Sequence, residues 1–240
     1  MPDIDLSRTA VPDASRHLRG YLAEPTSPGP WPGVVLIHEA FGLDDNMRRH
    51  ADRLAEMGYA TLAVDLYSDG GARRCLVATC RAFLSGKGRA FSDIDAARQW
   101  LVDRKITTGK VGVIGFCLGG GFALLVAGRG GYDAASVNYG LIPKDLDDVV
   151  AASCPVVASY GTKDRTVRNG AAQLETALTA AGVPHEISEY DGAGHAFLND
   201  AQGGPRVLQP VLRVAGIGPD PEAAPQAWRR IGAFFAEHLR

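Results

Sequence analysis

Cys117 lies in the stretch GFCLG (residues 115–119), two residues after one glycine and two residues before another. A nucleophile flanked by Gly115 and Gly119 is typical of a sharp turn between a strand and a helix, because glycine leaves room where side chains would collide. The helix that follows would point its free N–H groups at the thiol, which favours a thiolate and later an oxyanion. A small buried cysteine without chemistry is the alternative interpretation.

Two further residues of suitable chemistry follow Cys117 in the chain. Asp164 comes directly after an apolar run in YGTKD, and His195 lies in the glycine-rich stretch DGAGHAF. This order of nucleophile, acid and histidine is that of the triad of α/β-hydrolases, in which the acid orients the histidine and the histidine moves protons. Asp164 could be a turn residue and His195 a plain loop histidine, but three such residues in the right order favour a triad.

The stretch LIHEAFG (residues 36–42) supplies the remaining parts of a possible site. In this arrangement the loop after such a strand gives one N–H to the oxyanion, and the residue after the nucleophile gives the other. The oxyanion donors would therefore be the backbone amides of Ala40 and Leu118. From its spacing alone, Glu39 is best read as a favourable partner for a helix dipole, although beside the thiol it could hydrogen-bond or deprotonate it.

The elements that must position these residues can be predicted from apolar patterning. Buried strands are expected over residues 33–38, 60–65, 110–115, 134–140, 155–161 and 185–190. Helices are expected over residues 45–58, 92–105 (with Ser92 as the N-cap) and 169–182, and around Trp228, Ile231 and Phe235. This alternation indicates an α/β fold with a mostly parallel central sheet and helices on both faces. No repeat or linker is visible, so residues 1–240 are expected to form one domain.

Composition excludes several classes of protein. A net charge of −2 over 240 residues disfavours a nucleic-acid partner. The uncharged stretch of residues 111–128 contains six glycines, which weaken a membrane-spanning helix, so no membrane partner is expected. The first ten residues show no secretory signal, and the four cysteines form no Cys-x-x-Cys pair, which predicts a cytoplasmic chain with free thiols. The histidines lack zinc-site spacing, and the chemistry calls for no metal or other cofactor.

Several stretches taken together resemble the dienelactone hydrolase family of α/β-hydrolases, over about residues 15–239. They are IHEAFGL, VDLY (residues 64–67), VGVIGFCLGG, YGTKD and GAGHAF. The resemblance implies an α/β-hydrolase fold and hydrolysis of a small-molecule ester or lactone. It implies Cys117 as nucleophile, His195 as base and acid, and Asp164 as the group that orients the histidine. It also implies that Glu39 interacts with the cysteine and helps to generate the thiolate.

One departure from the family bears on the substrate. Family members bind a substrate carboxylate with arginines, one of them a few residues after the catalytic histidine, where this chain has Asn199. Arg81 is the preferred candidate for a second arginine, among Arg73, Arg74, Arg81 and Arg89, although all four could be solvated surface residues. Further candidates for contact with the substrate are Phe41, Tyr139 and Phe197.

Other functions stay open at this point. The chain could be a general carboxylesterase or thioesterase, or a binding protein on a hydrolase scaffold. It could also be a redox-active thiol protein, with Cys154 or the Cys75 and Cys80 pair resolving an oxidised Cys117. Residues 199–225 are expected near the mouth of the site, and no feature of the sequence indicates an oligomeric state.

Overall fold

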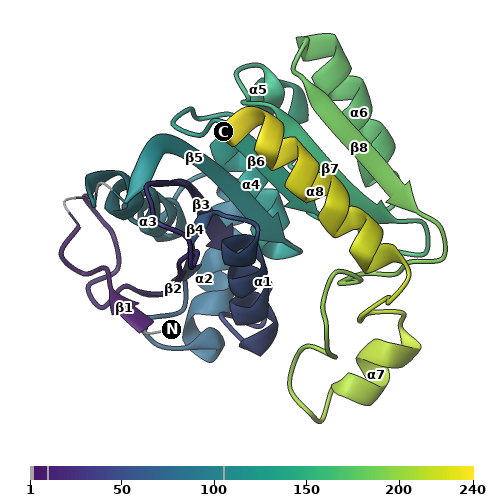
Figure 1. The fold of residues 1–240 in the computed structure, drawn as a ribbon. Helices are drawn as coiled ribbons and strands as arrows, with labels where there is room; N and C mark the ends of the chain where they lie inside the picture. The colour runs from purple at the N-terminus through teal and green to yellow at the C-terminus, as the bar shows by residue number, and fades with distance from the viewer. Residues whose placement is uncertain (1–2, 10, 105) are drawn as a thin grey trace.

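The computed structural model describes residues 3–9, 11–104 and 106–240, and its centre is an eight-stranded sheet (Figure 1). In space the strands follow the order β1-β2-β4-β3-β5-β6-β7-β8. All neighbours from β4 to β8 are parallel, whereas β1 pairs antiparallel with β2, and β2 with β4. The strands are β1 (Asp3–Asp5), β2 (Arg19–Ala23), β3 (Trp31–Ile37), β4 (Ala60–Asp65), β5 (Thr107–Phe116), β6 (Ala134–Asn138), β7 (Val156–Gly161) and β8 (His185–Tyr190).

Helices cover both faces of this sheet, which confirms the predicted fold class (Figure 1). They are α1 (Asp45–Glu56), α2 (Ala72–Ser85), α3 (Arg89–Asp103), α4 (Leu118–Ala127), α5 (Leu146–Val150), α6 (Gly170–Ala181), α7 (Gln209–Val214) and α8 (Ala223–Leu239). Successive residues of a strand point to opposite faces. On β3, Leu36 therefore belongs to the core cluster that includes residues of α1 and α8, whereas Val35 and Ile37 belong to the cluster on the other face, which includes residues of α2, α3, α4 and α6.

The uncharged stretch of residues 111–128 is a strand, a turn and a helix. β5 ends at Phe116, Cys117 follows, and every residue of α4 is buried. Among the residues that the structure describes, no helix has both the length and the apolar composition needed to cross a bilayer. Glycines of this stretch, whose number disfavoured a membrane-spanning helix, allow backbone segments to lie close together around Cys117.

The sequence prediction was wrong about the start of α3 and missed several elements. Ser92 lies inside the first turn of α3, and Gly88 is the N-cap instead, because its φ of 128° lets the chain reverse directly after α2. The predicted end of this helix at residue 105 lies outside the described residues. The missed elements are β1, β2, α2, α5 and α7. α2 buries only three side chains, so its apolar stripe is too narrow to recognise from the sequence.

Residues 200–216, here called the α7 arm, leave the loop that follows β8 and return to it. α7 has no buried residue and lies away from the sheet (Figure 1). The ends of the arm are fastened to the same loop, because Gly218 N–H donates to the carbonyl oxygen of His195 at 2.8 Å and Asp220 N–H donates to that of Phe197 at 3.0 Å. The arm is thus a loop whose two ends are both held next to the segment that contains His195.

Candidate active site

Cys117 alone makes the turn between β5 and α4. Its backbone has φ 54° and ψ −119°, a strained conformation for a residue with a side chain, and strain of this kind gathers at functional sites. The turn is held by the N–H of Cys117, which donates to the carbonyl oxygen of Asn138 at 3.0 Å. The side chain is partly exposed at the N-terminus of α4, as a nucleophile requires.

The glycines around Cys117 are needed because backbones touch there. A Cβ on Gly115 would lie 2.0 Å from the carbonyl oxygen of Gly119, and one on Gly119 would lie 2.2 Å from that of Ile37. Real Cβ atoms essentially never come closer than 3.0 Å to such an atom. The glycines therefore seat the start of α4 directly on the end of β3.

His195 and Asp164 follow the neighbouring strands β8 and β7 and meet beside Cys117. Nδ1 of His195 lies 2.6 Å from Oδ2 of Asp164, and Cys117 acts on the same imidazole by raising its pKa. Both the acid and the histidine are buried. An imidazole that donates Nδ1–H to a carboxylate leaves Nε2 free to exchange a proton with the nucleophile. The structure thus brings together the three residues whose order suggested a triad.

The pKa of His195 gives the fold a pH dependence. Burial alone would lower this pKa, but the interactions with Asp164 and Cys117 outweigh burial and raise it from 6.5 to about 10. A raised histidine pKa stabilises the fold fully below pH 6.5, and this contribution is lost as the pH rises toward about 10. We expect the melting temperature of the wild type to fall over this interval more steeply than that of Asp164→Asn, measured by scanning calorimetry. Equal slopes for the two proteins would contradict the prediction.

Thr166 belongs to the site although the sequence analysis did not single it out. Its N–H and its hydroxyl donate to Oδ1 of Asp164 at 2.8 and 2.6 Å, and the same hydroxyl lies 2.9 Å from Nδ1 of His195. The signal was local, since an aspartate followed two residues later by threonine commonly forms such a turn. These bonds and the bond from His195 outweigh burial and lower the pKa of Asp164.

After removal of the Thr166 hydroxyl, the Asp164 side chain is expected to be held less firmly while the carboxylate stays in place. Thr166→Val keeps the shape of the side chain but leaves Oδ1 of Asp164 one donor short, which costs about 1 to 2 kcal/mol when the acceptor is charged. We expect kcat for ester hydrolysis to fall by about 5- to 30-fold, measured at saturating substrate. Thr166→Ser, which keeps the hydroxyl, is the matched control and should stay near the wild type.

The backbone amides proposed as oxyanion donors are those of Ala40 and Leu118. Within the described residues, neither the amide of Ala40 nor that of Leu118 donates a hydrogen bond to a protein group. The loop that carries Ala40 is fixed by His38, whose Nδ1 lies 2.6 Å from the carbonyl oxygen of Glu39 and whose Nε2 accepts from the N–H of Leu66 at 3.1 Å. Two free N–H groups on a fixed frame can stabilise a developing oxyanion.

Glu39 is buried, and its partners are not the cysteine. Tyr139 donates its hydroxyl to Oε1 of Glu39 at 3.1 Å, and Nδ2 of Asn199 lies 3.2 and 3.3 Å from the two carboxylate oxygens. Burial raises the pKa of Glu39, although the nearby His195 and the two hydrogen-bond donors act in the opposite direction. Among the described residues, no hydrogen bond joins Glu39 to Cys117. The hydrogen-bond partners of the carboxylate are therefore Tyr139 and Asn199, and His195 is the nearby cation that lowers its pKa.

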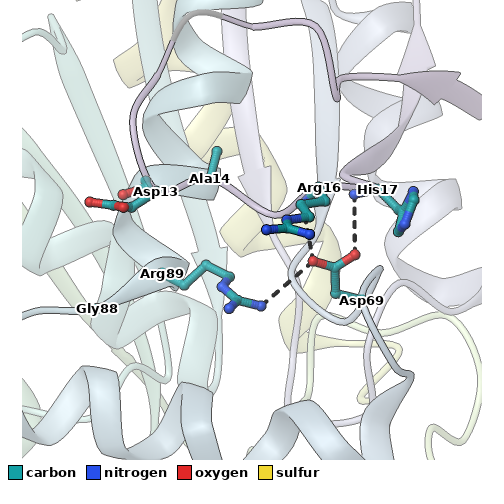
Figure 2. Close-up of a pocket in the computed structure, with 8 residues that line it drawn as sticks. Asp13, Ala14, Arg16, His17, Asp69, Gly88 and Arg89 are labelled. Carbon is teal, nitrogen blue, oxygen red and sulfur yellow. Dashed lines mark hydrogen bonds and ion pairs between the residues drawn. The ribbon is translucent and has the colours of Figure 1, made fainter.

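Arg81 lies on α2 with its side chain exposed to solvent. It lines a cavity of about 440 Å³ between α2 and α3, and neither Cys117 nor His195 is among the lining residues. An adjoining cavity of about 780 Å³ shares Arg89, whose guanidinium lies 3.5 Å from the carboxylate of Asp69 (Figure 2). Binding of a substrate carboxylate by Arg81 stays a prediction.

The aromatic candidates lie around the histidine at different depths. Tyr139 is fully buried, and its ring lies edge-on to His195 with 5.0 Å between ring centres. Phe197 is also fully buried and packs on Tyr139, with 5.7 Å between their ring centres. Phe41 is partly buried and contacts the α7 arm at Gly204. Of the three, Phe41 has side-chain surface available to a substrate.

The other three cysteines are free thiols in poor environments for redox chemistry. Burial raises the pKa of Cys75 and of Cys80, and it raises that of Cys154 to about 12. Resolution of an oxidised thiol by exchange requires a thiolate. These environments weigh against the redox hypothesis.

The mostly parallel sheet with a cysteine at the turn between β5 and α4 defines an α/β-hydrolase fold. The sequence model of the dienelactone hydrolase family matches residues 18–239. The chain therefore belongs to the dienelactone hydrolase family and is a hydrolase.

Individual relatives agree with this assignment. A carboxymethylenebutenolidase of Pseudomonas putida is 30% identical over 200 residues, which cover 78% of this chain and 84% of the relative. The protein usf of Aquifex pyrophilus is 30% identical over 241 residues, which cover 92% and 94% of the two chains. Among solved structures, a dienelactone hydrolase-like promiscuous phosphotriesterase from metagenomic libraries matches with a TM-score of 0.82 and 25% identity, over 100% of this chain and 99% of that one.

Proposed function

We propose that the chain hydrolyses ester or lactone bonds of a small molecule through a covalent acyl-enzyme on Cys117. The observation that carries the proposal is the meeting of three side chains from distant parts of the sequence. The thiol stands at the N-terminus of α4, it raises the pKa of the nearby His195, and Asp164 lies 2.6 Å from Nδ1 of the same histidine. The Pseudomonas putida relative, a carboxymethylenebutenolidase, supports this class of substrate.

In the first half of the reaction, the proton shared by Cys117 and His195 resides on the imidazole, as its raised pKa favours, and Sγ of the thiolate attacks the carbonyl carbon of the substrate. The oxyanion that forms accepts hydrogen bonds from the amides of Ala40 and Leu118. When the tetrahedral intermediate collapses, the bond from carbon to the leaving oxygen breaks and His195 protonates that oxygen. An alcohol leaves from an ester. In a lactone the new hydroxyl stays attached to the acyl group.

In the second half, a water molecule replaces the leaving group. His195 accepts a proton from the water, whose oxygen attacks the thioester carbon, and the bond between carbon and Sγ breaks to release a carboxylic acid and the thiol. Asp164 keeps the proton of the imidazole on Nδ1 and stabilises the charged form of the ring. Glu39 faces His195 from another side and stabilises the imidazolium that accompanies the thiolate.

The nucleophile favours certain leaving groups. A thiolate leaves more readily than an alkoxide, so the first intermediate collapses backwards for ordinary alkyl esters. Activated esters, enol-lactones and thioesters avoid this problem because their leaving groups are as good as the thiolate. Asn199, at the position where an arginine was expected, is bound to Glu39 and not free for a substrate carboxylate. A substrate carboxylate would therefore need another cation, and Arg81 stays the preferred candidate among Arg73, Arg74, Arg81 and Arg89.

The test compares a dienelactone with p-nitrophenyl acetate and looks for the intermediate. We expect a burst of p-nitrophenol equal to the enzyme concentration, and a single acetyl group on the peptide that contains Cys117 in acid-quenched samples. Faster turnover of the lactone than of the activated ester would support a dienelactone-like substrate, and turnover of the ester alone would point to a general esterase or thioesterase. Turnover without any acylated Cys117 would refute the proposal.

A further inference from the structure

The carboxylate of Glu39 is held by a chain of buried polar groups that reaches far from the nucleophile. Nδ2 of Asn199 lies within hydrogen-bond distance of both its oxygens, at 3.2 and 3.3 Å. Oδ1 of the same amide lies 3.0 Å from Nε2 of His50 on α1. Asn199 is only 2% exposed and His50 is 0% exposed. The proposed mechanism uses Glu39 but assigns no role to either of these residues.

The chemistry of the three groups fixes their orientation. A carboxylate only accepts hydrogen bonds, so the amide of Asn199 must turn its NH₂ toward Glu39 and its oxygen toward His50. An amide oxygen only accepts, so His50 must carry its proton on Nε2. Nδ1 of His50 is then an unprotonated nitrogen, and it is buried without a hydrogen-bond partner among the described residues. The ring is kept in place by Phe116 and Trp228, at 4.7 and 5.1 Å between ring centres.

His50 therefore orients the Asn199 amide without carrying a charge. Burial lowers its pKa to about 4, which keeps the imidazole neutral. The charged groups that face it are Asp200, Arg53 and Arg49. The titratable and charged groups that face Glu39 are His195, Asp44 and Tyr139. Of these three groups, His195 is the one that can carry a positive charge, so a fixed carboxylate there favours the imidazolium over the neutral ring.

We propose that Asn199 and His50 are positioning residues, and that the His50 ring orients the Asn199 amide so that the amide holds the Glu39 carboxylate against the Cys117–His195 pair. The proposal rests on the function proposed above, because it gives Glu39 a task in that mechanism. It also explains why an asparagine at this position is compatible with catalysis. A short neutral amide that is itself anchored can hold a buried carboxylate without neutralising it.

The first test uses variants that remove single links. Asn199→Leu keeps the branched shape of the side chain and removes both links, and it is expected to lower kcat about 10- to 100-fold with KM within about 3-fold. His50→Phe keeps the ring stack and is expected to lower kcat about 5-fold or more, whereas His50→Gln, which keeps an N–H donor, is expected to rescue most of the loss. If Asn199→Leu fails to fold, the comparison of His50→Phe with His50→Gln tests the proposal by itself. A wild-type kcat in both Asn199→Leu and His50→Phe would overturn the proposal.

The second test asks whether Asn199 acts through Glu39. In a Glu39→Gln background, Asn199→Leu should cost less than about 2-fold, because the carboxylate it holds is already gone. An undiminished loss in that background would overturn the proposal, since Asn199 would then act by another route.

The third test does not depend on turnover. Alkylation of Cys117 by iodoacetamide, followed by peptide mass spectrometry, should slow about 5-fold near pH 6 in Asn199→Leu, because the thiolate–imidazolium pair loses its fixed carboxylate. If alkylation slows in Asn199→Leu but the wild type shows no esterase activity, the positioning role is supported and the hydrolase function is refuted. If alkylation is unchanged in Asn199→Leu but the wild type is an active esterase, the hydrolase function is supported and the positioning role is refuted.

Discussion

Cys117→Ala is expected to lower kcat/KM toward p-nitrophenyl acetate by about 100,000-fold, because no thioester can form and only binding and the oxyanion amides still act. The substitution removes one sulfur atom from a partly exposed position, so the fold should persist. The measurement is initial rates of p-nitrophenol release at several substrate concentrations, together with a melting curve for each protein.

Cys80→Ala is the control for this experiment. Cys80 is also a free and partly buried cysteine, but it lies within α2 and not at a strand–helix turn. The kcat/KM of Cys80→Ala toward p-nitrophenyl acetate should stay within about 2-fold of the wild type. If Cys117→Ala were as active as Cys80→Ala, Cys117 would be a core residue and the mechanism proposed above would be wrong.

Gly119→Ala is expected to lower the free energy of unfolding by more than about 4 kcal/mol, the range reached when a core cannot adjust to an added group. The new Cβ would lie 2.2 Å from the carbonyl oxygen of Ile37 and 2.5 Å from that of His38. These atoms belong to the backbone of a central strand and its loop, so α4 would have to move away from β3. That movement would also separate the amides of Ala40 and Leu118. Guanidinium unfolding and ester hydrolysis measure the two effects.

The matched control is the same substitution in another helix. A Cβ on Gly232 of α8 would meet its nearest atom, Sδ of Met57, at 3.5 Å, which is an ordinary contact. Gly232→Ala should therefore leave stability unchanged or raise it by up to about 1 kcal/mol, because alanine favours a helix. A loss of stability at residue 119 no larger than at residue 232 would show that the start of α4 can move freely.

The fold and the core of the site could be predicted because their signals are local. Uninterrupted apolar runs mark parallel strands, and side chains just after such runs gather at one edge of the sheet. Cys117, Asp164 and His195 each follow a predicted strand, so their meeting required only the correct strand order. The starts of α2 and α3 could not be predicted in this way, because both helices begin at glycines without a side-chain cap.

The surroundings of Glu39 could not be predicted, because they depend on distant residues. Asn199 is 160 residues away from Glu39 and 149 residues away from His50 in the chain. Spacing favoured a helix-dipole role for Glu39, and the family resemblance favoured a role at the thiol. In the structure, the Glu39 carboxylate accepts hydrogen bonds from Tyr139 and Asn199, and no local sequence pattern indicates these partners.

The α7 arm can be exchanged as a unit beside His195. The chain on either side of the arm is joined by the bond from Gly218 N–H to the carbonyl oxygen of His195, so residues 200–216 form a closed loop whose length does not set the position of the imidazole. The entropic cost of closing a longer loop grows slowly with its length. Arms of other lengths and compositions can therefore be exchanged at this point, which offers a route to new substrates through recombination of one loop while the residues around Cys117 stay unchanged.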